Sequence, residues 1–178
     1  MARYKKTQLV LDKVFDARDC RHRIDGATVV LHCHHYATLY TQLAMDCSLI
    51  DAKALLSECS EDAWKSFLSS YYKTNAIALL TDRIAIGEQA YAAAGLGKMC
   101  VNSAGLDSGE VTLEHSHVDE GWIKKWGKNE EPVNLIGAGF ITGFFAALFE
   151  KPVRSYIATE IQSIVSGAAC SRFTVVAR

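Results

Sequence analysis

The sequence predicts an α+β fold in which N-terminal helices pack on a C-terminal antiparallel sheet. Apolar side chains recur at helical spacing through most of residues 35–94, whereas segments of alternating apolar and polar side chains are found from residue 98 onward. Helices that come mostly before strands, without regular alternation, are typical of α+β proteins. The chain has 178 residues, the usual length of one compact domain, and we expect residues 1–178 to form a single one.

The first half is expected to begin with a strand and to continue as helices. A short β-branched run follows the turn signal Asp25-Gly26. Ser48 and Asp51 are close to a capping-box pattern, and Ser60 is typical of another helix start. These signals predict a strand over 27–34 and helices over 35–46, over 48–58, from 60 and over 75–94. The helical stripes are Tyr36, Leu39, Tyr40 and Leu43, and then Trp64, Phe67, Leu68, Tyr71 and Tyr72.

The second half combines strands with one glycine-rich helix. Alternation predicts strands over 98–104 and 110–118, and Asp119 is expected to cap a short segment that holds Trp122 and Trp126. A helix is predicted over 135–150, and a hairpin over 153–165 and 170–177. Gly137, Gly139 and Gly143 would let another backbone or a ligand approach that helix closely.

Five of the six histidines fall in two groups: His32, His34 and His35, and then His115 and His117. Residues two apart on a strand point to one face, so each predicted strand would present a pair of imidazoles. Four converging imidazoles would suit a transition metal such as zinc or iron. The alternative is that these side chains end strands at the surface or pack in the core through one ring nitrogen.

Glu160 and Cys170 are a second candidate pair. The predicted hairpin is centred near Gly167, which would bring the two residues onto neighbouring strands. A carboxylate and a thiolate can bind a metal, and a thiolate with a lowered pKa can act as a nucleophile. The alternative is a glutamate at the solvent face and a cysteine that behaves as a small apolar side chain.

Two motifs at the end of the chain resemble a known family. They are Gly137-x-Gly-Phe-x-x-Gly-Phe144 and Glu160-x-x-Ser163-x-x-x-Gly167-x-x-Cys170-x-x-Phe173. Together they are similar to the ending of the 4-vinyl-reductase-like, or hydrocarbon-binding, domains. The resemblance is strongest over residues 85–178. It implies the fold of a vesicle-tethering subunit that cradles an acyl chain and of haem-based nitric oxide sensors.

The resemblance also implies an internal apolar pocket and a homodimer. The expected ligand is a hydrophobic or cyclic small molecule, with aromatic compounds and tetrapyrroles among the candidates. The residues expected to line the pocket are Trp122, Trp126, Phe140 and Phe144. The alternative for this group of aromatic side chains is ordinary core packing.

In family members that sense aromatic pollutants, the resemblance implies a structural zinc held by one Glu and three Cys. Glu160 and Cys170 fall on two of those positions, but Ser163 occupies a third, and no cysteine lies between residues 101 and 169 to supply the fourth. This departure favours the histidines over the chain end as the place of any metal.

Three functions follow from these patterns: a ligand-binding domain that acts as sensor, carrier or accessory subunit; a metal-dependent enzyme built on the histidines; or a structural subunit with an apolar patch along 135–149.

The net charge of −1 gives nucleic acid no basic surface to bind. The sequence contains no run of about 18 apolar residues, so it predicts no membrane span. The N-terminus lacks a signal-peptide pattern and six cysteines are irregularly spaced, so we expect a cytoplasmic protein with reduced thiols.

Overall fold

The computed structural model describes residues 7–30 and 32–178 of the chain. Within them, two antiparallel sheets and five helices form. In order, the elements are β1 (Lys13–Asp16), β2 (Arg21–Ile24), β3 (Ala27–Val29), α1 (His34–Asp46), α2 (Ala52–Thr74), α3 (Leu80–Ala93), β4 (Gly97–Ala104), β5 (Ser108–Ser116), α4 (His117–Trp126), α5 (Leu135–Leu148), β6 (Tyr156–Gln162) and β7 (Ser171–Ala177).

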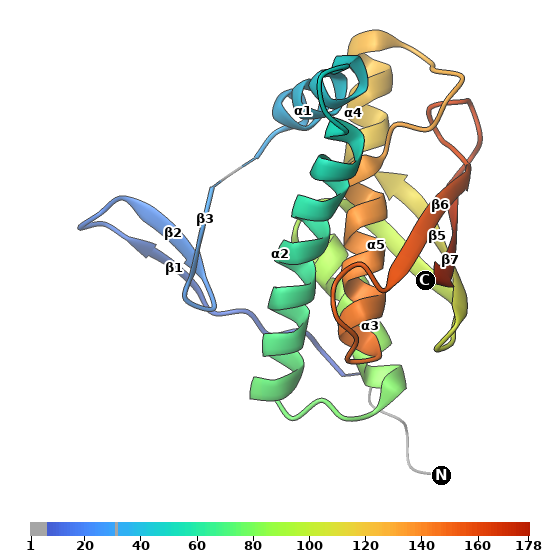
Figure 1. Cartoon of the computed structure of the whole chain (residues 1–178). Coiled ribbons are helices and arrows are strands. Elements are labelled where there is room, and N and C mark those ends of the chain that lie inside the picture. The colour runs from blue at the N-terminus through green and yellow to red at the C-terminus, as the bar shows by residue number, and fades with distance from the viewer. Residues whose placement is uncertain (1–6, 31) are drawn as a thin grey trace.

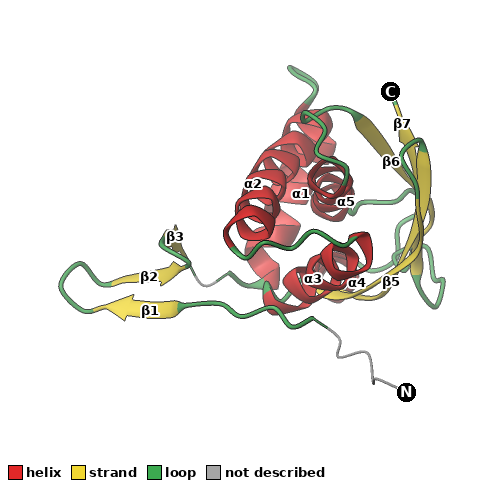
Figure 2. Ribbon diagram, turned by 90° about the horizontal axis from the view of Figure 1, so that it is seen from below, coloured by secondary structure: helices red, strands yellow, loops and turns green. Residues whose placement is uncertain are grey.

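The predicted α+β architecture is confirmed. The main sheet has the antiparallel order β4-β5-β7-β6, and its curved face is covered by helices from one side (Figure 2). The predicted C-terminal hairpin is present as β6 and β7. The strands β1, β2 and β3 form a separate small sheet that projects from the helices (Figure 1); we call residues 13–29 the arm. No helix in the described part of the chain is long and apolar enough to cross a membrane.

The glycine-rich helix α5 lies in the core and is in close contact with α2. A Cβ atom on Gly139 would lie 2.1 Å from the carbonyl oxygen of Ser57, and one on Gly143 would lie 2.6 Å from that of Glu61. These glycines therefore admit a helix backbone, one of the two roles that the sequence predicts for them. The prediction of an exposed apolar patch along 135–149 is wrong, because residues 139–147 are all buried.

Two predicted helices are a single one in the structure. The side chain of Asp51 caps α2 by accepting a hydrogen bond of 3.0 Å from the Ala54 amide, whereas the capping-box pattern assigns that role to Ser48. Ser60 does not begin a new helix, since its hydroxyl donates to the carbonyl of Ile136, 2.8 Å away, and so ties α2 to α5. The helix predicted from 75 begins only at Leu80.

Both strands that were expected to carry histidine pairs end earlier than predicted. β3 ends at Val29 and α1 begins at His34, while residue 31 lies outside the described part of the chain. β5 ends at Ser116, whose hydroxyl accepts a hydrogen bond of 3.2 Å from the amide of Asp119 and caps α4. His117 is thus the first residue of a helix, and Asp119 is not the cap.

Candidate functional site

A cleft separates the N-terminal segment and arm from helices α2 and α3. One half of the cleft is apolar and has a volume of about 190 Å³. Its lining residues are Leu9, Leu11, Ile24, Ala27, Val29, Ala63, Trp64, Phe67, Ala90, Ala93 and Ala94. We call this space and the polar half described next the arm cleft. All eleven lining side chains are apolar, so this half can hold a hydrophobic group.

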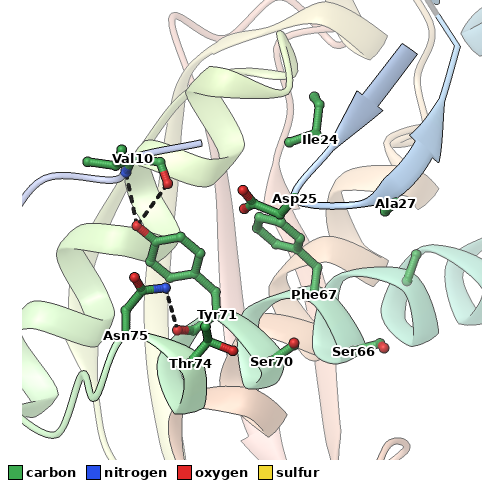
Figure 3. A pocket seen from close by; sticks show the side chains of 11 residues that line it. Val10, Ile24, Asp25, Ala27, Ser66, Phe67, Ser70, Tyr71, Thr74 and Asn75 are labelled. Atoms are coloured by element: carbon green, nitrogen blue, oxygen red, sulfur yellow. Dashed lines mark hydrogen bonds between the residues drawn. The ribbon is translucent and has the colours of Figure 1, made fainter. Parts of the chain in front are cut away.

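The polar half of the arm cleft has a volume of about 470 Å³ and shares four lining residues with the apolar half. Figure 3 shows Asp25 on the arm and Ser66, Ser70 and Thr74 on α2 around this space. The three hydroxyl residues are spaced by four, which places them on one face of the helix. This half therefore supplies hydroxyl groups and one carboxylate next to an apolar surface.

Hydrogen bonds hold the wall opposite α2 in place. The Tyr71 hydroxyl accepts from the Val10 amide at 2.9 Å and lies 3.3 Å from the Val10 carbonyl (Figure 3). The carboxylate of Asp25 accepts from the Asp12 amide at 2.8 Å, which fixes the turn between β2 and β3. Gln89 on α3 bonds to the Leu9 amide at 3.0 Å. The cleft is thus built by tertiary contacts between segments far apart in the sequence.

A third cavity, of about 660 Å³, continues along the arm to two of the predicted histidines, His32 and His117. The rings of His32 and His34 lie 6.2 and 6.3 Å from that of His117, measured between ring centres. Burial lowers the pKa of His32 and of His34, and the charges of neighbouring imidazoles act in the same direction.

The predicted convergence of four imidazoles is wrong. His115 is largely exposed and its Nδ1 lies 3.4 Å from the carboxylate of Glu120. His34 and His117 begin helices, so the two-residue spacing no longer places each pair on one face. Among residues 7–30 and 32–178, no group of three His, Cys, Asp or Glu side chains is arranged to hold a metal ion.

Glu160 and Cys170 have different surroundings. Cys170 precedes β7, and its sulfur lies 3.4 Å from the side-chain nitrogen of Gln162. The carboxyl group of Glu160 instead interacts with Asp119, Ser163 and Ser171. Glu160 pairs with Phe173 across the hairpin, and Ser171, one position after the predicted cysteine, is the polar residue of β7 that interacts with its carboxyl group.

Glu160 belongs to a group of interior polar side chains that we call the interior polar cluster: Tyr91, Ser116, Asp119, Asn134, Glu160, Ser163 and Ser171. Burial raises the pKa of Asp119. Burial, together with the nearby charge of Asp119, raises the pKa of Glu160 to about 7. Asp119 Oδ1, Glu160 Oε1 and the Tyr91 hydroxyl are buried without a hydrogen-bond partner.

The zinc site that the family resemblance implies does not fit this cluster. Zinc sites in proteins are built from thiolates and imidazoles, with carboxylates as a minor contribution. The cluster supplies hydroxyl, amide and carboxyl oxygens, and the one cysteine of the motif, Cys170, contacts Gln162. We therefore assign no metal to Glu160 and Cys170.

The four aromatic residues expected to line an internal pocket lie in two places. Phe140 and Phe144 are fully buried in the main core. Phe140 packs against Trp64 and Tyr91, with ring centres 4.7 and 4.8 Å apart. On α4, Trp122 is buried in a second, smaller core cluster and Trp126 is half exposed. Phe140 and Phe144 therefore contribute to core packing, and a ligand-binding role for any of the four remains a prediction.

Sequence reasoning missed most of the arm cleft. Trp64 and Phe67 were expected in a buried stripe, and both also line the cleft. The lining residues of the N-terminal segment and the arm carry no motif, since Leu9, Ile24 and Ala27 form a wall only when these segments lie opposite α2. The serine and threonine spacing on α2 was the available signal, but it is indistinguishable from an ordinary solvated helix face.

No protein-family model matches the chain, and no curated protein gives a significant match. Solved structures do share the fold. The phenol-responsive sensory domain of the transcription activator PoxR, solved with phenol, has a TM-score of 0.77 at 14% identity, over 93% of this chain and 84% of that one. Trafficking protein particle complex subunit 3 from Naegleria fowleri, covalently bound to palmitic acid, has a TM-score of 0.54 at 11% identity, over 82% and 94%.

These similarities place the chain in a fold class that includes a sensory domain and a trafficking-complex subunit. They agree with the predicted fold, in which helices pack on an antiparallel sheet. At these identities the similarity concerns the fold alone.

Proposed function

We propose that this protein binds a hydrophobic or cyclic small molecule in the arm cleft, as a sensor, a carrier or an accessory subunit. The apolar half of the cleft carries the proposal, because all its lining side chains are apolar and it opens onto hydrogen-bonding groups. Ligand sites commonly combine an apolar lining with a few polar groups that fix orientation. Two proteins that share the fold hold phenol and palmitate in their structures, which supports the proposal.

The size of the apolar half favours a single ring. A cavity of roughly 150 Å³ can hold benzene, and the apolar half has a volume of about 190 Å³. Pockets for larger, drug-sized ligands begin at about 300 Å³, so a monocyclic aromatic compound suits this half better than a tetrapyrrole. A hydroxyl on the ring would reach the polar half, where Asp25 and the serine hydroxyls accept hydrogen bonds.

The test is isothermal titration calorimetry with phenol, and with palmitate as a second probe. Ala93 lines the cleft and is exposed, so Ala93→Trp should fill the space and weaken binding at least about tenfold, equivalent to about 1.4 kcal/mol. Its neighbour Ala92 is equally exposed and does not line the cleft, so Ala92→Trp is the matched control. Saturable binding that Ala93→Trp leaves unchanged would refute this site, and the absence of binding by both probes would refute the ligand class.

A second candidate function rests on helix α1. Tyr36, Leu39, Tyr40 and Leu43, at positions i, i+3, i+4 and i+7, are each between 42% and 58% exposed. The buried face of α1 carries Ala37, Thr38, Thr41 and Ala44 instead. Apolar stripes of this spacing usually pack against another helix. We propose this stripe as the contact surface of a homodimer or of a larger complex. If so, Leu39→Ser with Leu43→Ser should reduce the mass measured by light scattering.

A further inference from the structure

The interior polar cluster joins five elements of the second half of the chain. Ser116 ends β5, Asp119 lies in the first turn of α4, and Asn134 caps α5. Glu160 comes from β6 and Ser171 begins β7. Four of these five side chains are at most 2% exposed, and Glu160 is largely buried. None of the ion pairs found among the described residues includes Asp119 or Glu160.

Asn134 is the centre of the cluster. Its side-chain oxygen accepts from the Gly137 amide at 2.8 Å. Its side-chain nitrogen donates to Ser116 Oγ at 2.9 Å and to Asp119 Oδ2 at 3.1 Å. One amide group therefore caps α5 and ties it to the end of β5 and to α4, with both of its N–H groups in use.

Asp119 receives a second hydrogen bond from the hairpin. Ser171 Oγ donates to Asp119 Oδ2 at 3.1 Å and accepts from the Ile164 amide at 3.0 Å. The same oxygen of Asp119 thus links α5, through Asn134, to β7. These bonds lie in the interior, where a lost partner leaves a polar group without water.

The free oxygens of the cluster are few. Asp119 Oδ1, Glu160 Oε1 and the Tyr91 hydroxyl are the unpartnered atoms, so a Ca²⁺ or Mg²⁺ ion, which takes about six or more ligands, would have to complete its shell with water in the protein interior. Zinc would require nitrogen or sulfur ligands. The oxygen atoms that bind the cluster together are already engaged by Asn134 and Ser171.

We propose that the interior polar cluster is a metal-free crosslink, in which hydrogen bonds from Asn134 and Ser171 to Asp119 hold α5, β7 and α4 together. The cluster performs the task of a structural metal ion, which is to join segments that are distant in the sequence. Because Ser163 and Ser171 both border the Glu160 carboxyl, replacing the two hydroxyls by thiols would convert the crosslink into a zinc site of two thiolates and two carboxylates.

The first test uses the unmodified protein, purified without an affinity tag. Elemental analysis should find less than about a tenth of an equivalent of any transition metal, and EDTA should leave the Tm unchanged within about 1 °C. A structural metal bound at about 1,000 times its Kd would contribute a Tm shift of roughly 8 °C or more for a chain of this size. A stoichiometric metal, or a fall of that size in EDTA, would overturn the proposal.

The second test is a gain of function. Ser163→Cys with Ser171→Cys should take up about one zinc ion and gain a Tm increase that EDTA reverses. The control is Ser166→Cys, at an exposed position in the same turn, which should bind no zinc. A folded double variant that takes up no more zinc than this control would contradict the proposed geometry.

The third test does not depend on that variant folding. Asn134→Ala removes the α5 cap and two interior donors, so the Tm should fall by about 6 to 12 °C. Asn129→Ala removes one exposed hydrogen bond, of 2.7 Å to Glu131, and should change the Tm by less than about 3 °C. Equal shifts for the two variants would show that the cluster is not a crosslink.

Discussion

Substitution of Glu160 by Gln should change how the stability of the fold depends on pH. Burial and the charge of Asp119 raise the pKa of Glu160 from 4.5 to about 7. A raised pKa means that the folded protein holds this proton more tightly than the unfolded chain does. The stabilisation by the proton is therefore complete below about pH 4.5 and is lost as the pH rises through about 7.

The size of the effect follows from the two pKa values. One pKa unit corresponds to about 1.4 kcal/mol, so a displacement from 4.5 to about 7 is equivalent to at most about 3 kcal/mol. Between pH 5 and pH 8 the free energy of unfolding should fall by roughly 2 kcal/mol because of this group. For a chain of this length, that is a Tm difference of about 4 to 8 °C. Gln has no proton to lose, so the variant should lack this component of the pH profile.

The assay is urea denaturation of the unmodified protein and of Glu160→Gln at several pH values from 5 to 8. The quantity to compare is the difference in the free energy of unfolding between the two proteins at each pH, because histidines titrate in the same range. Glu114→Gln is the control, since the hydrogen bond from Lys98 holds the pKa of the exposed Glu114 below its usual value. That control should run parallel to the unmodified protein from pH 5 to 8. Parallel profiles for Glu160→Gln as well would refute the reasoning.

Four further outcomes are expected. Gly139→Ala should lower the free energy of unfolding by about 1 to 3 kcal/mol in urea denaturation, because its methyl group would overlap the α2 backbone. Arg154→Ala should lower it by about 3 kcal/mol, because the buried Glu61 loses its 3.1 Å ion pair. Arg18→Ala, which removes an exposed ion pair, should leave the urea midpoint nearly unchanged in the same assay. For His115→Ala, which removes an exposed imidazole, calorimetric titration with zinc should give the same result as for the unmodified protein.

The sequence predicts well what depends on local patterns. The hairpin of β6 and β7, the glycine-rich helix and the helix of residues 34–46 all follow from periodicity and turn residues. Periodicity did not show which face of α1 is buried. Its apolar stripe was identified from spacing, yet the fold buries the opposite face, with Thr38 and Thr41, against neighbouring helices. The choice of face is a tertiary property, which spacing alone does not determine.

The histidine prediction was wrong for a related reason. An alternating run that ends in Ser116 and His117 can continue as a strand or begin a helix, and the Ser116 cap settles the matter in favour of a helix. The pair Glu160 and Cys170 failed through register, because Glu160 pairs with Phe173 and the buried residues of β7 are Ser171, Phe173 and Val175. Cys170 lies one residue before Ser171, and successive residues of a strand point to opposite faces.

The location of the proposed ligand site follows from how the core is filled. Phe140 contacts Trp64 on one side and Tyr91 on the other, so rings occupy the interior between the helices and the sheet. Trp64 also lines the arm cleft, while the Tyr91 hydroxyl belongs to the interior polar cluster. A hydrophobic ligand therefore meets the outer edge of this row of rings, in a cleft that needs the arm as its second wall. Each ring is in direct contact with the next. A ligand that repositions Trp64 would therefore shift Phe140 and, through it, Tyr91 of the interior polar cluster. Whether the two sites are coupled in energy is then a question that the Glu160→Gln and Ala93→Trp variants, measured singly and together, can answer.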